Sequence, residues 1–451
     1  MRRATRRNAG LLLLGDVFSC MAALFIALVL RHGAWPDMTL LSPHLGPFLV
    51  LTLVSVLIFF IAGLYDTRLV FARRDLPDLV LKTQVINILL AALFFFLFPV
   101  GITPKTILAL YLIVSTALII YWRMFLFPLV SPGAVARAVV IGNGEDAKVV
   151  SQALHANAGL GCVCVEMVDI HAYGSTARLR AKLTELVSAR GIDTIIADMS
   201  DEYAKRLASL YYDLAFPGAT ACFIRLHEFY EQLFCRVPLS LVGKAWFLEN
   251  IRADGPHCGY SFLKRTIDIA VALLLLVPCV VLFPMVALAI KLQDGGKVLY
   301  KTERVGQYGR PIHLYKFRTM TGMDLGMTLD TKHAVTPLGR FLRKTRIDEL
   351  PQLWNIVQGD LSFVGPRPEL PARARVYAET IPYYAMRHLI KPGLSGWAQI
   401  NNFEVPRGEV DIARTIEKLS FDLYYLKRHS LILDLEIILK TIKTMLLRSG
   451  S

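Results

Sequence analysis

The sequence predicts a membrane protein with three parts: a bundle of transmembrane helices, an α/β domain, and a third domain that begins with a membrane-embedded helix. Three observations lead to this prediction. They are four apolar stretches near the N-terminus, alternating strand-like and helix-like segments in the middle, and a fifth apolar stretch that contains prolines. The composition agrees, because 54% of the 451 residues are hydrophobic and only 19% are charged, which is more apolar than a typical soluble protein.

The first four apolar stretches each approach the roughly 20 residues that cross a hydrocarbon core. They occupy residues 11–30, 47–64, 79–100 and 107–130, and we predict a four-helix transmembrane bundle over residues 1–130. We expect the first stretch to be a retained span, since no clear signal-peptide cleavage site follows it. Its one acidic residue, Asp16, is expected near the membrane interface rather than as a functional intramembrane charge.

Arginines mark the cytoplasmic ends of these stretches, because positive residues favour that side of the membrane. They precede the first stretch, separate the second from the third, and end or follow the fourth: Arg2, Arg3, Arg6, Arg7, Arg68, Arg73, Arg74, Arg123 and Arg137. We therefore expect the N-terminus, the middle loop and everything after the fourth stretch to be cytoplasmic.

Residues 131–250 are predicted to form a Rossmann-like cytoplasmic domain. A strand-like AVVIG leads into a turn with Gly142 and Gly144 and then a helical KVVSQALHA, the pattern that lets backbone N–H groups approach a pyrophosphate. Further strands are expected at CVCVEMVD, which ends on Asp169, and at DTIIAD. Gly142 and Gly144 are thus candidate cofactor-binding residues, although glycines that merely close a tight turn remain an open alternative.

The seven cysteines are odd in number and scattered, so they predict neither a disulfide framework nor a zinc site. The formal net charge of +14 suits nucleic acid, anionic lipid and phosphorylated substrates equally well. Charge alone therefore leaves the kind of ligand open.

The fifth apolar stretch, near residues 264–291, is long enough to cross the membrane, but we expect it to be re-entrant. Basic residues flank both of its ends: Lys264, Arg265 and Lys291. Pro278 and Pro284 interrupt it, and each removes a helical hydrogen bond and bends the axis. A broken helix that enters and leaves on one face explains both features. An ordinary kinked span is the alternative.

Three clusters rich in Gly, Pro and paired polar residues carry the candidate chemistry. They are TERVGQYGRPIHLYKFRTM, TPLGRFLRKTRIDELPQLWNIVQGDLSFVGPRPEL and IKPGLSGWAQINN. Four basic residues lie close to Asp348 and Glu349 in the second cluster: Arg340, Arg343, Lys344 and Arg346. We expect their charge to lower the pKa of Asp348, leaving an ionised nucleophile. Adjacent carboxylates also suit Mg²⁺ beside substrate phosphates, although a solvated pair in a first helical turn is the simpler alternative.

Taken together with LKRTIDIA and the late FDLYYLKRHSLILDLEIILKT, the clusters closely resemble the polyprenyl-phosphate sugar-1-phosphate transferases. These bacterial sugar transferases are monotopic phosphoglycosyl transferases, and the whole chain is similar to their large, multidomain branch. The resemblance implies an α/β phosphoglycosyl transferase catalytic domain at residues 251–451 and a re-entrant helix broken at proline. It implies that Asp348 attacks the β-phosphate of a UDP-sugar, expels UMP and forms a covalent intermediate that polyprenyl (undecaprenyl) phosphate then attacks.

The same resemblance implies roles for further residues. Asp348 and Glu349 would hold Mg²⁺, and a second set would bind substrate: Lys316, Arg318, Arg343, Arg367, Gln399 and Asn401. It implies a multi-pass protein of the bacterial inner membrane whose catalytic domain faces the cytoplasm. Its expected partners are the bilayer, downstream glycosyltransferases and possible further copies of the chain, with no nucleic acid.

One departure from the family pattern leaves the sugar open. The family often continues with Gly-Arg after WAQIN, whereas this chain has Asn402-Phe403-Glu404, so Arg407 is a candidate replacement.

The sequence leaves two other functions as alternatives. An NAD-dependent nucleotide-sugar dehydratase would need a Tyr-x-x-x-Lys pair late in the Rossmann-like domain, and the one match, Tyr260 and Lys264, lies beyond it. A non-catalytic scaffold for glycan assembly would not need the Asp-Glu pair and its basic neighbours.

Overall fold

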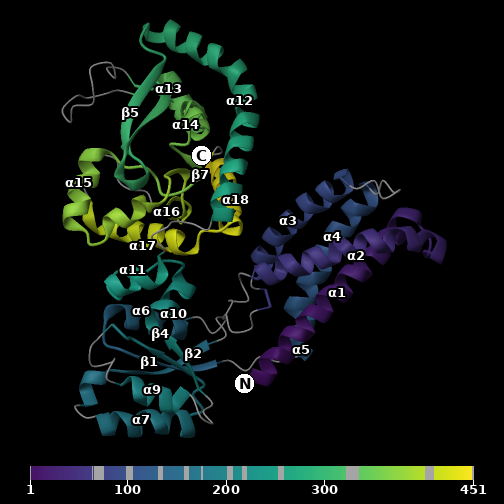
Figure 1. Ribbon diagram of the computed structural model, residues 1–451, viewed down its shortest axis with the longest axis vertical. Coiled ribbons are helices and arrows are strands. Elements are labelled where there is room, and N and C mark those ends of the chain that lie inside the picture. Colours follow the sequence, from purple (N-terminus) through teal and green to yellow (C-terminus); the bar gives the residue numbers. More distant parts are fainter. Residues whose placement is uncertain are drawn as a thin grey trace. The chain divides into compact units, whose positions relative to one another are not determined.

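A computed structural model describes most of the chain (Figure 1). The described residues are 2–62, 64–65, 76–97, 105–130, 136–156, 162–173, 176–200, 207–215, 221–251, 258–320, 335–401 and 411–448. Arg407 and the arginines of the 66–75 loop lie outside them. The chain divides into two compact units, Met1–Phe229 and Tyr230–Ser451.

The first unit begins with the four predicted apolar helices. They are α1 (Arg2–His32), α2 (Met38–Ile61), α3 (Leu76–Leu97) and α4 (Lys105–Tyr121), the last continued by a π-helical turn η1 (Trp122–Leu126) and by α5 (Phe127–Val130). Each is long and apolar enough to cross a membrane, which indicates a membrane protein. Leu24, Leu28 and Phe48 pack inside the group, whereas Phe18 and Leu53 face outward, as lipid contact requires.

Asp16 lies inside this group of helices and is paired there. Arg123 donates to both of its carboxylate oxygens, at 3.0 Å from Nε and 2.5 Å from Nη2, and the Tyr65 hydroxyl donates to it at 2.8 Å. Arg123 also donates to the carbonyl of Leu64 at 2.9 Å. The charge expected near the membrane interface is therefore fully buried and neutralised by a residue of η1.

The α/β part of this unit contains four parallel strands in the order β2-β1-β3-β4. They are β1 (Ala136–Ile141), β2 (Cys162–Val168), β3 (Thr194–Ala197) and β4 (Cys222–Arg225). The first three were predicted, whereas the short, more exposed edge strand β4 was not. Figure 1 shows α7 (Thr176–Ala189) and α9 (Ala208–Ala215) together beside the sheet, which carries α6 (Glu145–Ala156) immediately after β1. The described cysteines whose side chains are placed are free thiols.

The second unit is an α/β domain with short strands. An antiparallel hairpin of β5 (Leu299–Val305) and β6 (Pro311–Phe317) precedes α13 (Pro337–Thr345), η6 (Ile347–Glu349) and α14 (Gln352–Gln358). A parallel pair, β7 (Ser362–Val364) and β8 (Gly393–Ser395), flanks α15 (Pro371–Thr380) and η7 (Tyr384–Leu389). The chain ends with α16 (Trp397–Ile400), α17 (Ile412–Arg428) and α18 (Leu431–Arg448).

The core of this unit reaches further toward the N-terminus than residue 251, where the catalytic domain was predicted to start. After α10 (Leu226–Phe234), Val237 and two residues of α11 (Lys244–Asn250), Trp246 and Phe247, pack in one buried cluster with residues such as Tyr384. The compact unit accordingly begins at Tyr230.

The fifth apolar stretch forms one helix, α12 (Cys258–Asp294), which continues through Pro278 and Pro284. The interruption expected at these prolines is therefore a bend, which Figure 1 shows along α12, because a proline can be accommodated when only its own turn loses a hydrogen bond. By length and composition α12 is also a candidate span. The described residues thus contain five such helices, one more than the predicted bundle.

Candidate active site

The Asp348-Glu349 pair lies on a tight turn directly after α13. Thr336 begins α13 by accepting a hydrogen bond from the Gly339 amide at 2.9 Å, with Pro337 in the first turn, as helix N-termini favour. The helix ends at Arg346, whose φ of 61° is left-handed. That conformation reverses the chain and starts the 3₁₀ turn η6 that carries both carboxylates.

Glu349 is held by three basic side chains. Lys316 Nζ donates to its Oε1 at 2.6 Å, while Arg367 Nη2 lies 3.6 Å from Oε1 and Arg346 Nη1 lies 3.8 Å from Oε2. Burial opposes ionisation of Glu349, but the charges of Lys316 and Arg367 and the hydrogen bond from Lys316 outweigh it and lower its pKa to about 2. Glu349 is therefore a fixed anion.

The pKa of Asp348 is shifted in the opposite direction from that of Glu349. Only 8% of the residue is exposed, and burial, followed by the charge of Glu349, raises the pKa of Asp348 above its ordinary value. Lys316, Arg346 and Arg343 only partly offset these effects. The prediction of a lowered pKa is thus wrong, because proximity in sequence to basic residues does not reveal how deeply a carboxylate is buried.

One oxygen of Asp348 is also without a partner. Oδ1 is buried and accepts no hydrogen bond within the described part of the chain. A buried polar atom normally has a partner, so an orphaned carboxylate oxygen is a mark of a reacting or ligand-binding group. This is the atom that a nucleophile or a cation ligand would use.

The structure brings some of the predicted substrate-binding residues to the pair and directs others elsewhere. Lys316 and Arg367 contact Glu349, and Arg343 lies close enough to affect the pKa of Asp348 while its Nε donates to Thr319 Oγ1 at 2.9 Å. Arg318, next to β6, donates from Nε to the carbonyl of Met320 at 3.2 Å, and its guanidinium packs over Gly296.

The β7–β8 pair joins the turn at residues 365–368 to the segment that leads to Gln399. In this pairing Val364 lies opposite Ser395, and Gly365 N donates to the Ser395 carbonyl at 2.9 Å. A Cβ atom on Gly393 would overlap the backbone of Gly365, so two glycines permit a close approach that no other residue allows. Arg367 and Gln399 are thereby placed on adjoining segments.

Gln399 and Asn401 differ in their surroundings. Gln399 Oε1 is buried with no hydrogen-bond partner among the described residues, which leaves it available to a ligand. Asn401 Nδ2 donates to the carbonyl of Trp397 at 2.8 Å, so its amide closes the short helix α16. The structure therefore supports Gln399 more strongly than Asn401 as a substrate contact.

A buried ion pair behind the site was not recognised from the sequence. Arg387 and Asp422 are each 2% exposed at the side chain, and Arg387 Nε donates to Asp422 Oδ2 at 2.9 Å. Arg387 also donates to the Tyr384 hydroxyl and to the carbonyl of Arg367, both at 3.0 Å. It thus fixes the backbone of the residue whose side chain reaches Glu349. The acidic residue in FDLYYLKR was the only available signal, since nothing in the spacing links it to Arg387.

The two carboxylates at this turn could supply the protein ligands of a Mg²⁺ ion, because Mg²⁺ usually binds one or two carboxylates together with substrate phosphates and water. No group of three or more His, Cys, Asp or Glu side chains suited to a metal occurs in the described ranges. The unpartnered Asp348 Oδ1 fits such a cation, whereas Glu349 must share its carboxylate with Lys316.

The turn after β1, the candidate cofactor-binding site, is surrounded by acidic side chains, which disfavour binding of a phosphate. Gly142 has a φ of 153°, and its backbone lies against the side chain of Asp198. Glu145 and Asp146 occupy the first turn of α6, where they already complement the helix dipole that would attract a pyrophosphate. These charges favour the turn-closing role of Gly142 and Gly144.

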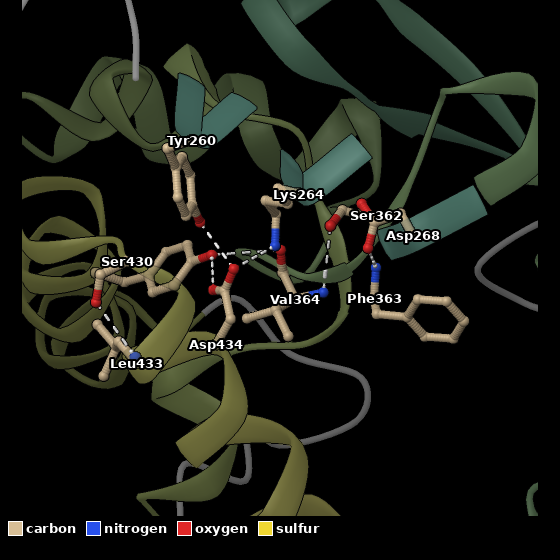
Figure 2. A network of polar contacts seen from close by, with 10 residues as sticks. Tyr260, Lys264, Asp268, Ser362, Phe363, Val364, Ser430, Leu433 and Asp434 are labelled. Atoms are coloured by element: carbon tan, nitrogen blue, oxygen red, sulfur yellow. Dashed lines mark hydrogen bonds and ion pairs between the residues drawn. The ribbon is translucent and has the colours of Figure 1, made fainter. Parts of the chain in front are cut away.

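Tyr260 and Lys264 are engaged in a structural network rather than in a nucleotide site. Both belong to α12, and Figure 2 shows them pointing toward Asp434 of α18. The Tyr260 hydroxyl and Lys264 Nζ each donate to Asp434 Oδ2 at 2.8 Å, and Tyr425 donates to Oδ1 at 2.6 Å. The Tyr-x-x-x-Lys pair that a dehydratase would require is thus used to attach α12 to the domain.

Comparison with known proteins places this site in a family. Residues 259–448 match the family model for bacterial sugar transferases. Over 215 residues the chain is 37% identical to the UDP-glucose:undecaprenyl-phosphate glucose-1-phosphate transferase of Caulobacter vibrioides, and the match covers 46% of this chain and 79% of that protein. The chain belongs to the bacterial sugar transferase family.

Other sugar transferases are similar to this chain over stretches of comparable length. The sugar transferase EpsL of Bacillus subtilis is 40% identical over 190 residues, which cover 42% of this chain and 89% of EpsL. The Escherichia coli protein named UDP-glucose:undecaprenyl-phosphate glucose-1-phosphate transferase is 41% identical over 195 residues. That match covers 42% of this chain and 41% of the E. coli protein, so the chain spans about two fifths of that relative.

Proposed function

We propose that this protein transfers a sugar 1-phosphate from a UDP-sugar to polyprenyl phosphate, the first membrane step in making a bacterial surface glycan. Its relatives in E. coli and C. vibrioides are named for such a transfer to undecaprenyl phosphate. The observation that carries the proposal is the buried Asp348, with an unpartnered oxygen, beside a Glu349 anchored by Lys316 and Arg367.

The proposed reaction has two steps at one phosphorus atom. An Asp348 oxygen attacks the β-phosphorus of the UDP-sugar, the bond to the bridging oxygen breaks, and UMP leaves with the bonding electrons. The sugar phosphate then sits on the carboxylate as an acyl phosphate. A polyprenyl phosphate oxygen attacks the same phosphorus and releases the carboxylate, so ping-pong kinetics are expected.

The basic residues of the site would act mainly on charge and position. Lys316, Arg343 and Arg367 can stabilise the negative charge of the diphosphate and of the transferring phosphoryl group. We propose that Asp348 and Glu349 hold Mg²⁺, which would neutralise phosphate charge when bound. The side-chain amide of Gln399 can form hydrogen bonds with the UDP-sugar, because its Oε1 has no partner among the described residues.

We further propose that α12 is re-entrant and that the catalytic domain lies on the cytoplasmic face of the inner membrane. Support comes from the packing of both ends of α12 on the same domain. Near its start, Lys264 binds Asp434, and near its end the buried Ile290 packs with Phe317 and Leu342. A straight helix of 37 residues would be about 55 Å long, nearly twice the hydrocarbon thickness of about 30 Å.

The N-terminal helices and the parallel-sheet domain lie outside the proposed catalytic domain. We propose that the four N-terminal helices span the membrane as a bundle and provide a surface for self-association. The parallel-sheet domain is taken as Rossmann-like in topology. The lipid-linked product would be a substrate for downstream glycosyltransferases.

The proposal is tested with purified protein, Mg²⁺, polyprenyl phosphate and a panel of UDP-hexoses and UDP-N-acetylhexosamines. We expect UMP release with at least one donor, a sugar-phosphate adduct on Asp348 by mass spectrometry when acceptor is omitted, and loss of both in Asp348→Asn. The exposed Arg375→Lys on α15 serves as a folded control. Wild-type turnover by Asp348→Asn would refute the nucleophile assignment.

A further inference from the structure

A cavity of about 420 Å³ lies between α12, the β5–β6 hairpin and the start of α14. The bend of α12 forms one wall, with Leu276, Cys279 and Phe283 facing inward. Tyr315 and Phe317 of β6 also line the cavity, and the Phe317 ring packs against that of Phe283, with their centroids 5.1 Å apart. In volume the cavity falls within the range of sites that hold small organic ligands.

The chemistry of this cavity is unlike that of the Asp348 site. Its lining is mostly aliphatic and aromatic, and the polar side-chain groups among the lining residues are the Tyr315 hydroxyl, the Cys279 thiol and the Trp354 indole N–H. A nucleotide, a diphosphate or a sugar would lose hydrogen bonds to water there without replacing them. An apolar chain would be stabilised by burial. The cavity therefore suits a hydrocarbon.

The position of the cavity identifies which hydrocarbon. Leu350 and Pro351 line it and follow Asp348 and Glu349 directly in the chain. A ligand whose phosphate lies at Asp348 thus has its tail within reach of this cavity. Trp354, also in the lining, is 52% exposed, which suits the edge between protein and lipid where tryptophan is enriched.

We propose that this cavity is a subsite for the first isoprene units of the polyprenyl phosphate acceptor and that it presents the acceptor phosphate to Asp348. The inference rests on the proposed function and deepens it. An acyl tail of a phospholipid has the same apolar character, but only the acceptor must bring its phosphate to Asp348. We therefore assign the cavity to the acceptor.

The first test fills the cavity and separates the two half-reactions. Leu276→Trp is compared with Leu274→Trp, because Leu274 lies on the same helix but is 70% exposed and does not line the cavity. We expect Leu276→Trp to raise the KM for polyprenyl phosphate at least tenfold. Exchange of labelled UMP into UDP-sugar, which needs no acceptor, should stay within twofold of wild type in both variants.

The second test uses the unaltered protein, so it does not depend on a variant folding. Cys279 should react with a small apolar maleimide in detergent, and polyprenyl phosphate should protect it. The exposed Cys222 should react equally with and without the acceptor. Neither UDP-sugar nor phosphatidylglycerol micelles should protect Cys279.

Several results would overturn the inference. An acceptor subsite would be excluded if the two tryptophan variants had equal KM values for polyprenyl phosphate, or if polyprenyl phosphate did not protect Cys279. Equal protection of Cys279 by phosphatidylglycerol would also exclude it and would indicate a general site for lipid tails. Absence of UMP exchange in the wild type with every donor would instead refute the proposed function. The two failures are therefore distinguishable.

Discussion

Asp348 and Glu349 are neighbours in sequence, yet their surroundings move their pKa values in opposite directions. Glu349 is paired with Lys316 and stays ionised, while burial and the Glu349 charge raise the pKa of Asp348. Such a division is common where two carboxylates have separate tasks. In the proposed mechanism, Glu349 would then supply charge and orientation, and the protonation of Asp348 would limit its attack.

The pH dependence of UMP exchange should therefore report Asp348. Attack needs the ionised carboxylate, so the rate should fall as pH drops through a pKa that lies above that of an ordinary aspartate. Glu349→Gln removes the neighbouring negative charge, which should lower the pKa of Asp348 and move the acidic limb of the residual activity to lower pH. Lys316→Met should move it to higher pH. Limbs that coincide in all three proteins would contradict this account.

Arg387 is predicted to be a positioning residue for Arg367. Arg387→Lys keeps the charge but cannot make the same set of hydrogen bonds to Asp422, Tyr384 and the Arg367 carbonyl. Hydrogen bonds to charged groups contribute about 1.5–3 kcal/mol, so we expect kcat/KM for the UDP-sugar to fall roughly 10- to 100-fold. The acceptor KM should change less than twofold, whereas general unfolding would reduce the active fraction without this difference. Arg375→Lys is the matched control.

The site residues show what sequence can and cannot reveal. The family resemblance implied substrate-binding roles for Lys316, Arg343 and Arg367. The structure places these residues near the pair, and the roles themselves stay predictions. The direction of the Asp348 pKa shift was predicted wrongly, since it depends on burial. The Arg387–Asp422 pair was missed because its partners come from η7 and α17 and no local pattern relates them.

At the level of elements, the β7–β8 pair depends on glycine. Gly393→Ala would place a Cβ atom into the backbone of Gly365, and a backbone cannot rotate away as a side chain can. Overpacking typically costs about 1–3 kcal/mol, so we expect a lower thermal midpoint and a larger loss of activity through the displaced Arg367 turn. Gly243→Ala, where a Cβ meets nothing within 4 Å, should leave both unchanged. Equal effects at the two positions would refute the packing argument.

The course of α12 is predicted to begin and end on one side of the membrane. Single cysteines at Phe262 and Leu292, both exposed, should resist an impermeant maleimide in spheroplasts and react after lysis, in a background without other cysteines. Trp35, exposed between α1 and α2, should react in intact spheroplasts when replaced by cysteine. Labelling of Leu292→Cys from outside would show that α12 crosses the membrane.

The elements themselves were largely foreseen, with informative exceptions. Apolar length revealed the first four helices, and the strand-turn-helix pattern revealed β1, β2 and β3. The edge strand β4 was missed because only four residues pair and none is fully buried. The prolines of α12 suggested a break, but the helix bends and continues, since the cost of one proline is local.

On the scale of the whole chain, the family match and the compact units agree about where the catalytic part resides. Residues matched by the family model lie within Tyr230–Ser451. The proposed catalytic residues, Asp348 and Glu349, also belong to this unit. The first unit therefore has no evident part in the chemistry, and the proposed activity should survive its removal.

Two truncations test both this independence and the domain boundary. Residues 230–451 keep Val237, Trp246 and Phe247, which pack in the core, whereas residues 251–451, the domain predicted from sequence, lack them. Loss of a large buried aromatic side chain costs about 3–5 kcal/mol, a large share of the roughly 5–15 kcal/mol that stabilises a typical domain.

We expect the longer fragment to release UMP in membranes at a rate within about tenfold of the full chain. The shorter fragment should aggregate or unfold at a much lower temperature, because it lacks Trp246 and so exposes the surface that this side chain covers. Lys427 belongs to that surface, with its Nζ 5.1 Å from the centroid of the indole ring. Equal stability of the two fragments would place the boundary at residue 251 after all.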